Sequence, residues 1–249
     1  MAQSRIIYGV HAVLAALTHH PENVLTLYCQ DKTDPHRIAN ILQTAQAAAL
    51  TIQPMSREKL DKLTQSKHHQ GVAAQVRQQS TYDEEAVLSW LATATRPLLL
   101  ILEGVQDPHN LGACLRSAEA LGVDWVILPK VHTAPLNATV SKVACGADQS
   151  LPIAMVSNLA RFLKQLQQQG VWIIGTALSA NKMLDEVDYT GPIAIVMGAE
   201  DTGLKRLTQE HCDELVKIPL SGTVESLNVS VATGICLYEI IRQRKHGKC

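Results

Sequence analysis

Apolar positions in the first 78 residues alternate between short runs and helical spacing. The runs favour strands, and the i, i+3, i+4 repeats favour helices. The predicted strands cover residues 6–8, 24–29 and 71–76, and the predicted helices cover residues 10–17, 35–50 and 56–63, the last one capped by Ser56. This alternation predicts a small α/β module.

From residue 97 onward the apolar runs become longer and more continuous. Residues 98–102 (LLLIL) and 193–197 (IAIVM) have the composition of strands that are buried on both faces. Further strands are expected at residues 125–128 and 171–176, and helices at residues 110–121, 136–144 and 158–169. Strands that alternate with helices predict a parallel sheet with both faces covered. Ligands of such sheets bind beyond the carboxyl ends of the strands.

A polar stretch separates the two patterned regions. Residues 78–96 contain one short helical pattern at residues 84–91 and end in Thr-Ala-Thr-Arg-Pro. We therefore predict a small domain at residues 1–77, a linker at residues 78–96 and an α/β domain at residues 97–249.

The stretch at residues 218–241 has an unusual design: a short apolar run, a polar loop and then a helix. Ser226 and Asn228 precede the helix, where short polar side chains cap free N–H groups. Four apolar residues fall on one face of that helix: Val231, Ile235, Tyr238 and Ile241. This pattern fits two alternatives. One is an ordinary connection between a strand and a helix, and the other is a loop that binds a ligand with its backbone N–H groups.

Two earlier stretches share this design and favour the ligand site. Residues 103–116 follow the first buried run, and residues 198–203 (GAEDTG) follow the second. Gly198, Gly203 and Gly222 permit close backbone approach, as a nucleoside cofactor requires. Glu103, Glu200 and Glu225 are too dispersed to form an acid–base pair, and Glu200 and Arg116 also fit ordinary solvated positions.

Charge and cysteine usage exclude several other classes. The net charge of -1 argues against a protein that binds nucleic acid through charge alone. Local basic runs at Arg57, Lys59, Lys62 and Lys67, and at Arg242, Arg244, Lys245 and Lys248, are more often solvated faces than binding sites. Six scattered cysteines form no zinc or disulfide pattern, and adjacent histidines point apart, so no metal is predicted. We find no dinucleotide-binding or P-loop motif and no signal peptide, and expect a cytoplasmic protein.

Three stretches in order resemble the signature motifs of a known family. NLGACLRSAEALG, IVMGAEDTGL and IPLSGTVESLNVSVATG are similar to those of the SpoU (TrmH-type) RNA 2′-O-methyltransferases of the SPOUT superfamily. The resemblance covers residues 97–244. YGVHAV and HQGVAA, in the first 77 residues, resemble that family's small ribosomal-protein-like RNA-binding domain.

The resemblance implies a homodimer with a C-terminal trefoil knot that binds S-adenosylmethionine. The implied cofactor contacts are Gly198, Ile218, Leu227 and Thr176. The implied catalytic residues are Asn110, Arg116, Glu200, Ser226 and Asn228. In such dimers the arginine is thought to act beside the partner's cofactor.

Within the family, the sequence is most similar to enzymes that methylate a guanosine ribose of 23S ribosomal RNA. A transfer RNA methyltransferase and a non-catalytic dimeric RNA-binding protein are the alternatives. Arginine stays protonated at ordinary pH and is a poor base. Our hypothesis is that Arg116 binds the target phosphate and stabilises charge on the 2′-oxygen, while a carboxylate or water accepts the proton.

Overall fold

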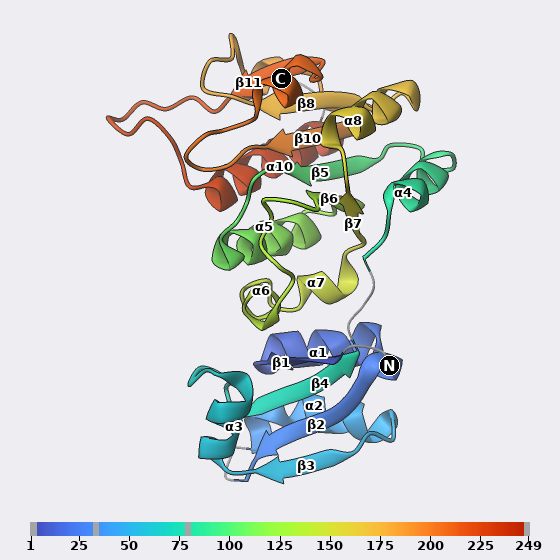
Figure 1. Ribbon diagram of the computed structural model, residues 1–249, viewed down its shortest axis with the longest axis vertical. Coiled ribbons are helices and arrows are strands. Elements are labelled where there is room, and N and C mark those ends of the chain that lie inside the picture. Colours follow the sequence, from blue (N-terminus) through green and yellow to red (C-terminus); the bar gives the residue numbers. More distant parts are fainter. Residues whose placement is uncertain (1–3, 32–34, 78–80, 247–249) are drawn as a thin grey trace. The chain divides into compact units, whose positions relative to one another are not determined.

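The chain forms two compact units in a computed structural model that describes residues 4–31, 35–77 and 81–246 (Figure 1). Unit 1 comprises residues 1–80 and 135–150, and unit 2 comprises residues 81–134 and 151–249. The grouping of residues 135–150 with unit 1 differs from the predicted boundaries, which put them in the domain at residues 97–249. Lys248 and residues 78–80 of the predicted linker lie outside the described residues.

Unit 1 is built on a mixed four-stranded sheet in the order β1-β4-β2-β3. β4 runs antiparallel to both β1 and β2, whereas β3 runs parallel to β2. Its elements are β1 (Ser4–Tyr8), α1 (Val10–His19), β2 (Val24–Gln30), α2 (Pro35–Ala47), β3 (Ile52–Met55), α3 (Arg57–Thr64), β4 (Val72–Arg77), α6 (Ala138–Val143) and α7 (Ala147–Ser150).

The sequence predicted every strand and α-helix described at residues 4–77 except β3, and it did not predict the short 3-10 helix at Pro21–Asn23. That strand (IQPM) is half-exposed and contains Pro54, which a sheet tolerates only at an edge or a bulge. The core of unit 1 lies between the sheet and its helices, with Ile7, Val13, Leu27 and Ile41 at most 1% exposed.

Residues 135–150 are joined to β1 by a buried ion pair. The Arg5 guanidinium contacts the Asp148 carboxylate at 2.8 Å and also donates to the Leu136 carbonyl at 2.6 Å. A Cβ on Gly146 would lie 2.4 Å from the Cβ of Ala15, so this segment packs tightly on α1. These contacts explain why the segment belongs to unit 1.

Unit 2 contains a seven-stranded parallel sheet in the order β7-β6-β5-β10-β8-β11-β9. The predicted central strands are confirmed at β5 (Leu98–Leu102) and β10 (Ile193–Met197), and all ten residues are buried. The other elements are α4 (Glu84–Leu91), α5 (Pro108–Ala120), β6 (Trp125–Pro129), β7 (Ile153–Val156), α8 (Leu159–Gln168), β8 (Trp172–Thr176), β9 (Lys182–Met183), α9 (Arg206–Glu210), β11 (Glu214–Lys217) and α10 (Val229–His246).

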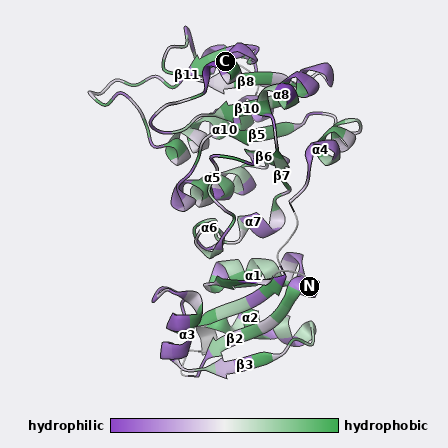
Figure 2. Ribbon diagram, viewed as in Figure 1, coloured by the Kyte–Doolittle hydropathy of each residue, from purple (hydrophilic) through white to green (hydrophobic). Residues whose placement is uncertain are grey.

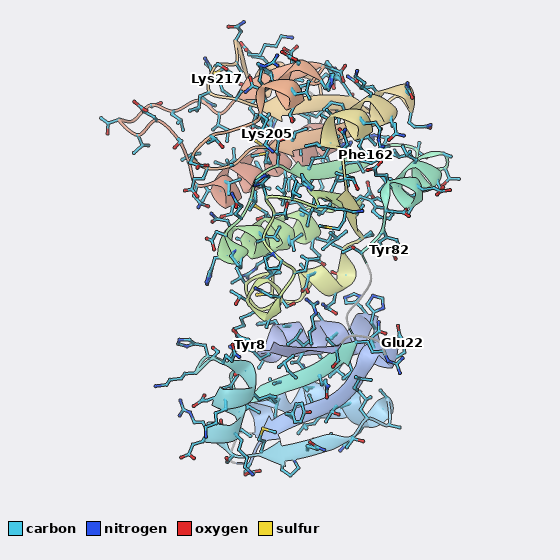
Figure 3. All side chains as sticks on the ribbon, in the orientation of Figure 1. Tyr8, Glu22, Tyr82, Phe162, Lys205 and Lys217 are labelled. Atoms are coloured by element: carbon cyan, nitrogen blue, oxygen red, sulfur yellow. The ribbon has the colours of Figure 1, made fainter. Side chains whose placement is uncertain are left out.

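Helices pack on both faces of this sheet. Phe162 of α8, labelled in Figure 3, is fully buried in one cluster with Val87 of α4, Ile101 of β5 and Val196 of β10. Neighbouring strand residues point to the opposite face, where α5 packs along α10 and α10 contacts β10. In Figure 2 the central strands are green and hydrophobic, whereas α3 of unit 1 is largely purple. Among the described residues, no helix has the length and apolar character needed to cross a membrane.

The strand expected at the start of residues 218–241 lies earlier than predicted. β11 covers Glu214–Lys217, and Ile218 follows it. Glu214 and Lys217 make the strand look polar in sequence, and only Val216 is fully buried. The segment between β11 and α10 projects away from the sheet (Figure 1).

Candidate active site

The loops that follow the strands of unit 2 surround a cavity of about 370 Å³. Because the strands are parallel, the loops after β5, β8, β10 and β11 all leave from the same edge of the sheet. Residues that line this cavity come from the last three of these loops and from the start of α10: Thr176, Leu178, Met197, Gly198, Glu200, Asp201, Gly203, Leu204, Val216, Lys217, Ile218, Leu220, Ser226, Leu227, Val229 and Ala232 among others. We call it the first cavity.

All four residues expected to contact a cofactor line the first cavity: Gly198, Ile218, Leu227 and Thr176. The Thr176 hydroxyl donates to the Val196 carbonyl at 3.2 Å, which ties the end of β8 to β10. The sequence therefore placed these four positions around one cavity, although they come from three separate stretches of the chain.

The loop after β10 closes tightly on itself. Ala199 and Gly203 exchange two backbone hydrogen bonds, with N···O distances of 3.2 and 2.9 Å. A Cβ on Gly198 would lie 2.3 Å from the carbonyl carbon of Gly203, so only glycine fits there. The closed loop presents Glu200 and Asp201 to the cavity.

Three polar side chains from three loops form a hydrogen-bonded cluster at the edge of the cavity. The Asn110 amide donates to Glu200 Oε2 at 3.0 Å. The Asn228 amide donates to Asn110 Oδ1 at 2.9 Å and lies 3.3 Å from Glu200 Oε2. We call Asn110, Glu200 and Asn228 the amide–carboxylate cluster.

Local structure fixes the two asparagines in different ways. Asn228 Oδ1 accepts from the Ser230 backbone N–H at 3.0 Å, so Asn228 caps α10 as predicted. Asn110 does not cap α5. Asp107 takes that role by accepting from the His109 N–H at 3.0 Å, because Pro108 fits the first position of a helix. Asn110 lies inside α5, and its side chain is free to reach Glu200.

A second cavity of about 370 Å³ adjoins the cluster. Gly104, Val105, Gln106, Asp107 and Asn110 line it from the loop after β5, and Glu200, Asp201 and Val229 line both cavities. The amide–carboxylate cluster therefore lies between two cavities, where a carboxylate can contact ligands in both.

Ser226 and Arg116 are outside the cluster. Ser226 lines the first cavity but makes no hydrogen bond with another described side chain. Arg116 is exposed in the middle of α5, lines neither cavity and has no ion-pair partner among the described residues. The structure thus brings together four of the five predicted catalytic residues around the cavities and leaves Arg116 apart.

The apolar residues that identified α10 form an exposed face of that helix. Val231 is 51% exposed, Ile235 37% and Tyr238 62%, while Ile241 is half-buried. The buried face carries Thr233, Cys236, Leu237 and Ile240 instead. We call Val231, Ile235 and Tyr238 the exposed α10 face.

The two basic runs differ in the structure. Arg244 is half-buried and donates to the carbonyls of four residues, and burial lowers the pKa of its guanidinium. Arg242 pairs with Glu239 at 2.7 Å. Most of the described C-terminal run is therefore structural. In unit 1, Arg57, Lys59, Lys62 and Lys67 are all exposed to solvent.

The first cavity fits the chemistry of S-adenosylmethionine. Apolar side chains such as Met197, Ile218 and Leu227 offer a surface for an adenine ring. Within the described chain, no backbone N–H of residues 218–227 donates to another residue, which leaves these groups available to a ligand. Glu200 and Asp201 supply negative charge beside a cation such as a sulfonium. Among the described residues, no group of His, Cys, Asp and Glu side chains is arranged to hold a metal ion.

Some lining residues carry no signal in the sequence. Leu178 and Leu220 line the first cavity from the loops after β8 and β11, and Gln209 lines it from α9. Lys217 is the last residue of β11 (Figure 3) and reaches the cavity because it precedes Ile218. Only knowledge of the strand order would have identified these positions.

Comparison with known proteins gives consistent matches over both parts of the chain. Residues 97–238 match the SpoU rRNA Methylase family, and residues 6–82 match the family described as RNA 2′-O ribose methyltransferase substrate binding. The protein from Escherichia coli K12 named 23S rRNA (guanosine-2′-O-)-methyltransferase RlmB is 48% identical over 97% of this chain and 99% of its own. The protein of the same name from Yersinia pestis is 50% identical over 97% and 98%.

Solved structures share the fold. The SpoU methyltransferase AviRb from Streptomyces viridochromogenes, in complex with AdoMet, superposes with a TM-score of 0.81 at 24% identity, over 98% of this chain and 92% of that chain. A structure described as an RNA 2′-O ribose methyltransferase gives a TM-score of 0.80 at 26% identity, over 98% and 90%.

Proposed function

The chain belongs to the SpoU rRNA methylase family, and from this premise we propose that it methylates the 2′-oxygen of a guanosine ribose in 23S ribosomal RNA with S-adenosylmethionine as donor. The observation that carries this proposal is the position of the amide–carboxylate cluster between a cavity suited to the cofactor and a second cavity. Relatives named for this reaction are about half identical over nearly the whole chain, which supports the substrate.

Gly198, Ile218, Leu227 and Thr176 would hold the cofactor in the first cavity. When bound, S-adenosylmethionine supplies a methyl group on a positively charged sulfur. Glu200 and Asp201 favour that charge through electrostatic attraction. The closed loop at residues 198–203 holds both carboxylates at the cavity wall before the ligand arrives, which reduces the entropy lost on binding.

Glu200 is our candidate for the group that accepts the proton of the ribose hydroxyl. A hydroxyl is a weak nucleophile and needs a base as the new bond forms. The amides of Asn110 and Asn228 donate to the Glu200 carboxylate and hold its orientation. The remaining lone pairs can accept from a ribose hydroxyl in the second cavity. Ser226, at the wall of the first cavity, would position the ligand.

We propose that the functional form is a homodimer in which Arg116 acts beside the partner's cofactor. Arg116 lies on α5, which packs along α10, and lines neither cavity of its own chain. The exposed α10 face is apolar, as expected of a surface that a second copy covers. The planar guanidinium can bind a phosphate through two parallel hydrogen bonds and can stabilise negative charge on the 2′-oxygen.

Residues 1–77 are proposed to bind the RNA, with residues 78–96 as linker and residues 97–249 as the methyltransferase domain. The four exposed cations at Arg57, Lys59, Lys62 and Lys67 would contact phosphates. A trefoil knot near the C-terminus is the expected topology of unit 2, and the insertion of β10 between β5 and β8 supports it. The ribosomal RNA substrate puts the reaction in the cytoplasm.

Transfer of labelled methyl from S-adenosylmethionine to protein-free 23S RNA tests the proposal, with transfer RNA assayed beside it. We expect label at one guanosine ribose of 23S RNA, and transfer slower by about a hundredfold to a thousandfold with Arg116→Ala. Label in transfer RNA alone would contradict the proposed substrate but support the proposed reaction. A protein that binds no S-adenosylmethionine would contradict the enzyme and favour a non-catalytic RNA-binding role.

A further inference from the structure

Glu103 is a buried carboxylate that lines neither cavity. It follows β5 directly and is 4% exposed. Its Oε2 accepts from the Lys205 backbone N–H at 3.0 Å, and its Oε1 accepts from the Thr208 hydroxyl at 2.8 Å. Both donors lie about a hundred residues later, beyond the loop at residues 198–203; Lys205 is labelled in Figure 3. A carboxylate is costly to bury unless such donors satisfy it, so these bonds hold firmly.

The backbone of Glu103 contacts the other end of the same loop. Its N–H donates to the carbonyl of Met197, the last residue of β10, at 2.9 Å. A Cβ on the next residue, Gly104, would lie 3.0 Å from the Cβ of Ala199, so the two loops are in close contact. Glu103 therefore binds the chain before the loop through its backbone and the chain after it through its side chain.

The loop between these two anchors carries Glu200. Glycines at its start and end give the loop more backbone freedom than other residues would. The two hydrogen bonds between Ala199 and Gly203 close the loop but do not fix it to the sheet. The Glu103 side chain and the buried side chain of Leu204 attach the chain at the end of the loop. Asn110 and Asn228 contact Glu200 itself.

We propose that Glu103 is a positioning residue for cofactor binding: it fixes the loop at residues 198–204 and so sets the place of Glu200 between the two cavities. This inference rests on the proposed function, because it assigns the loop to S-adenosylmethionine. Glu103 contacts no ligand itself. Its effect passes through Lys205 and Thr208 to the wall of the first cavity.

Isosteric substitutions separate positioning from folding. Glu103→Gln keeps the shape but puts an amide where two donors point, and Thr208→Val removes the donor hydroxyl at nearly constant volume. Thr208→Ser keeps the hydroxyl and should therefore keep the affinity for S-adenosylmethionine that Thr208→Val loses. A matched control is Asp124→Asn, because Asp124 accepts from the Leu98 backbone N–H at 2.8 Å at the opposite end of β5.

The measurement is the Kd of purified full-length protein for S-adenosylmethionine by titration calorimetry. Melting temperatures, the KM for S-adenosylmethionine and the kcat of methyl transfer are measured beside it. We expect Glu103→Gln to raise the Kd and the KM about tenfold, the effect of losing about 1.4 kcal/mol. Thr208→Val should raise them about threefold, as expected for one weaker hydrogen bond. Thr208→Ser and Asp124→Asn should stay within about twofold, even where Asp124→Asn melts earlier by the loss of its own bond.

Unchanged Kd and KM in both Glu103→Gln and Thr208→Val, with lower melting temperatures, would overturn the inference and leave Glu103 a purely structural residue. If Glu103→Gln does not fold, the pair Thr208→Val and Thr208→Ser still decides the question. Failure of the wild type to bind S-adenosylmethionine would instead contradict the proposed function, so the two failures are distinguishable.

Discussion

Two residues of α5, Asn110 and Arg116, differ in their contacts. Near the start of α5, Asn110 is held in the amide–carboxylate cluster by side chains from two other loops. Two turns later Arg116 is exposed, beside a helix whose exposed face is apolar. Under the proposed function, one chain would form the cofactor cavity by itself, and a second copy would complete the part of the site that holds the RNA phosphate. The predictions that follow test this contrast.

The largest expected effect is that of Arg116→Ala on methyl transfer. Removal of one donor that stabilises developing charge costs about a hundredfold to a thousandfold in rate. Arg116→Lys should be only partly active, because lysine cannot form the bidentate fork. The Kd for S-adenosylmethionine should not change in either variant, because Arg116 lines neither cavity.

Mixing two variants of low activity tests whether Arg116 acts across a dimer. Co-expressed Arg116→Ala and Glu200→Gln chains should form mixed dimers in which one site has both residues intact. Recovery of methyl transfer supports action in trans. No recovery, despite proven mixed dimers, would place Arg116 in the site of its own chain.

Glu200→Gln and Asn228→Asp should lower kcat by about tenfold to a hundredfold, the range of a missing general base or its orienting partner. Asn228→Asp keeps the cap of α10 but puts a second carboxylate beside Glu200. A single-turnover assay isolates this effect from product release. Ser230→Ala removes the hydroxyl that donates to Asn228 Oδ1 at 2.6 Å and so tests the orientation of Asn228 separately. A wild-type kcat in Glu200→Gln would contradict a role of Glu200 as the base.

A charge on the exposed α10 face should weaken the proposed dimer. Tyr238→Glu and Ile235→Glu would put a carboxylate into an apolar interface at a cost of several kcal/mol. Sedimentation velocity should show monomers that still fold, because both side chains lie outside the core. Their melting temperature should fall only by the stabilisation that association supplied. Val131→Glu is a control at another exposed apolar position that lines neither cavity. A variant Tyr238→Glu that stays dimeric would place the interface elsewhere.

The smallest expected effect concerns Cys114, which lies between the two ends of α5. Burial raises the pKa of its thiol from 9.0 to about 11. The neutral thiol therefore contributes stability below pH 9 that is lost as the pH rises towards 11. At pH 10 the loss is about 1.4 kcal/mol, one pKa unit. Urea unfolding at pH 8 and pH 10 should show a smaller decrease in the free energy of unfolding for Cys114→Ala than for wild type. Equal decreases would contradict the raised pKa of Cys114.

The sequence predicted the central strands well because β5 and β10 are short, continuous apolar runs. A helix of a globular protein is longer and carries polar residues on one face. The sequence predicted the three loops of the site because glycines and short polar residues follow those runs. It predicted that α5 begins at residue 110 instead of Pro108, since Asn110 and Asp107 are both good caps and only the Asp-Pro pair separates them.

Tertiary contacts account for what the sequence could not provide. Periodicity identified the apolar face of α10, but spacing alone cannot tell a face that packs on its own sheet from one left exposed. Glu103 was dismissed as dispersed from the other carboxylates, because its partners lie 102 and 105 residues away. The ion pair of Arg5 with Asp148 spans 143 residues and carries no local pattern.

That ion pair has a consequence for synthesis on the ribosome. The four strands of unit 1 are complete at Arg77, but α6 and α7, with Asp148, emerge much later. During that interval the face of α1 that receives Gly146 is uncovered and Arg5 lacks its carboxylate. Meanwhile β5 and β6 have already left the ribosome. The last step of unit 1 folding must then compete with the first strand pairing of unit 2. The fraction of nascent chains that fold correctly therefore depends on the rate of translation through residues 78–150.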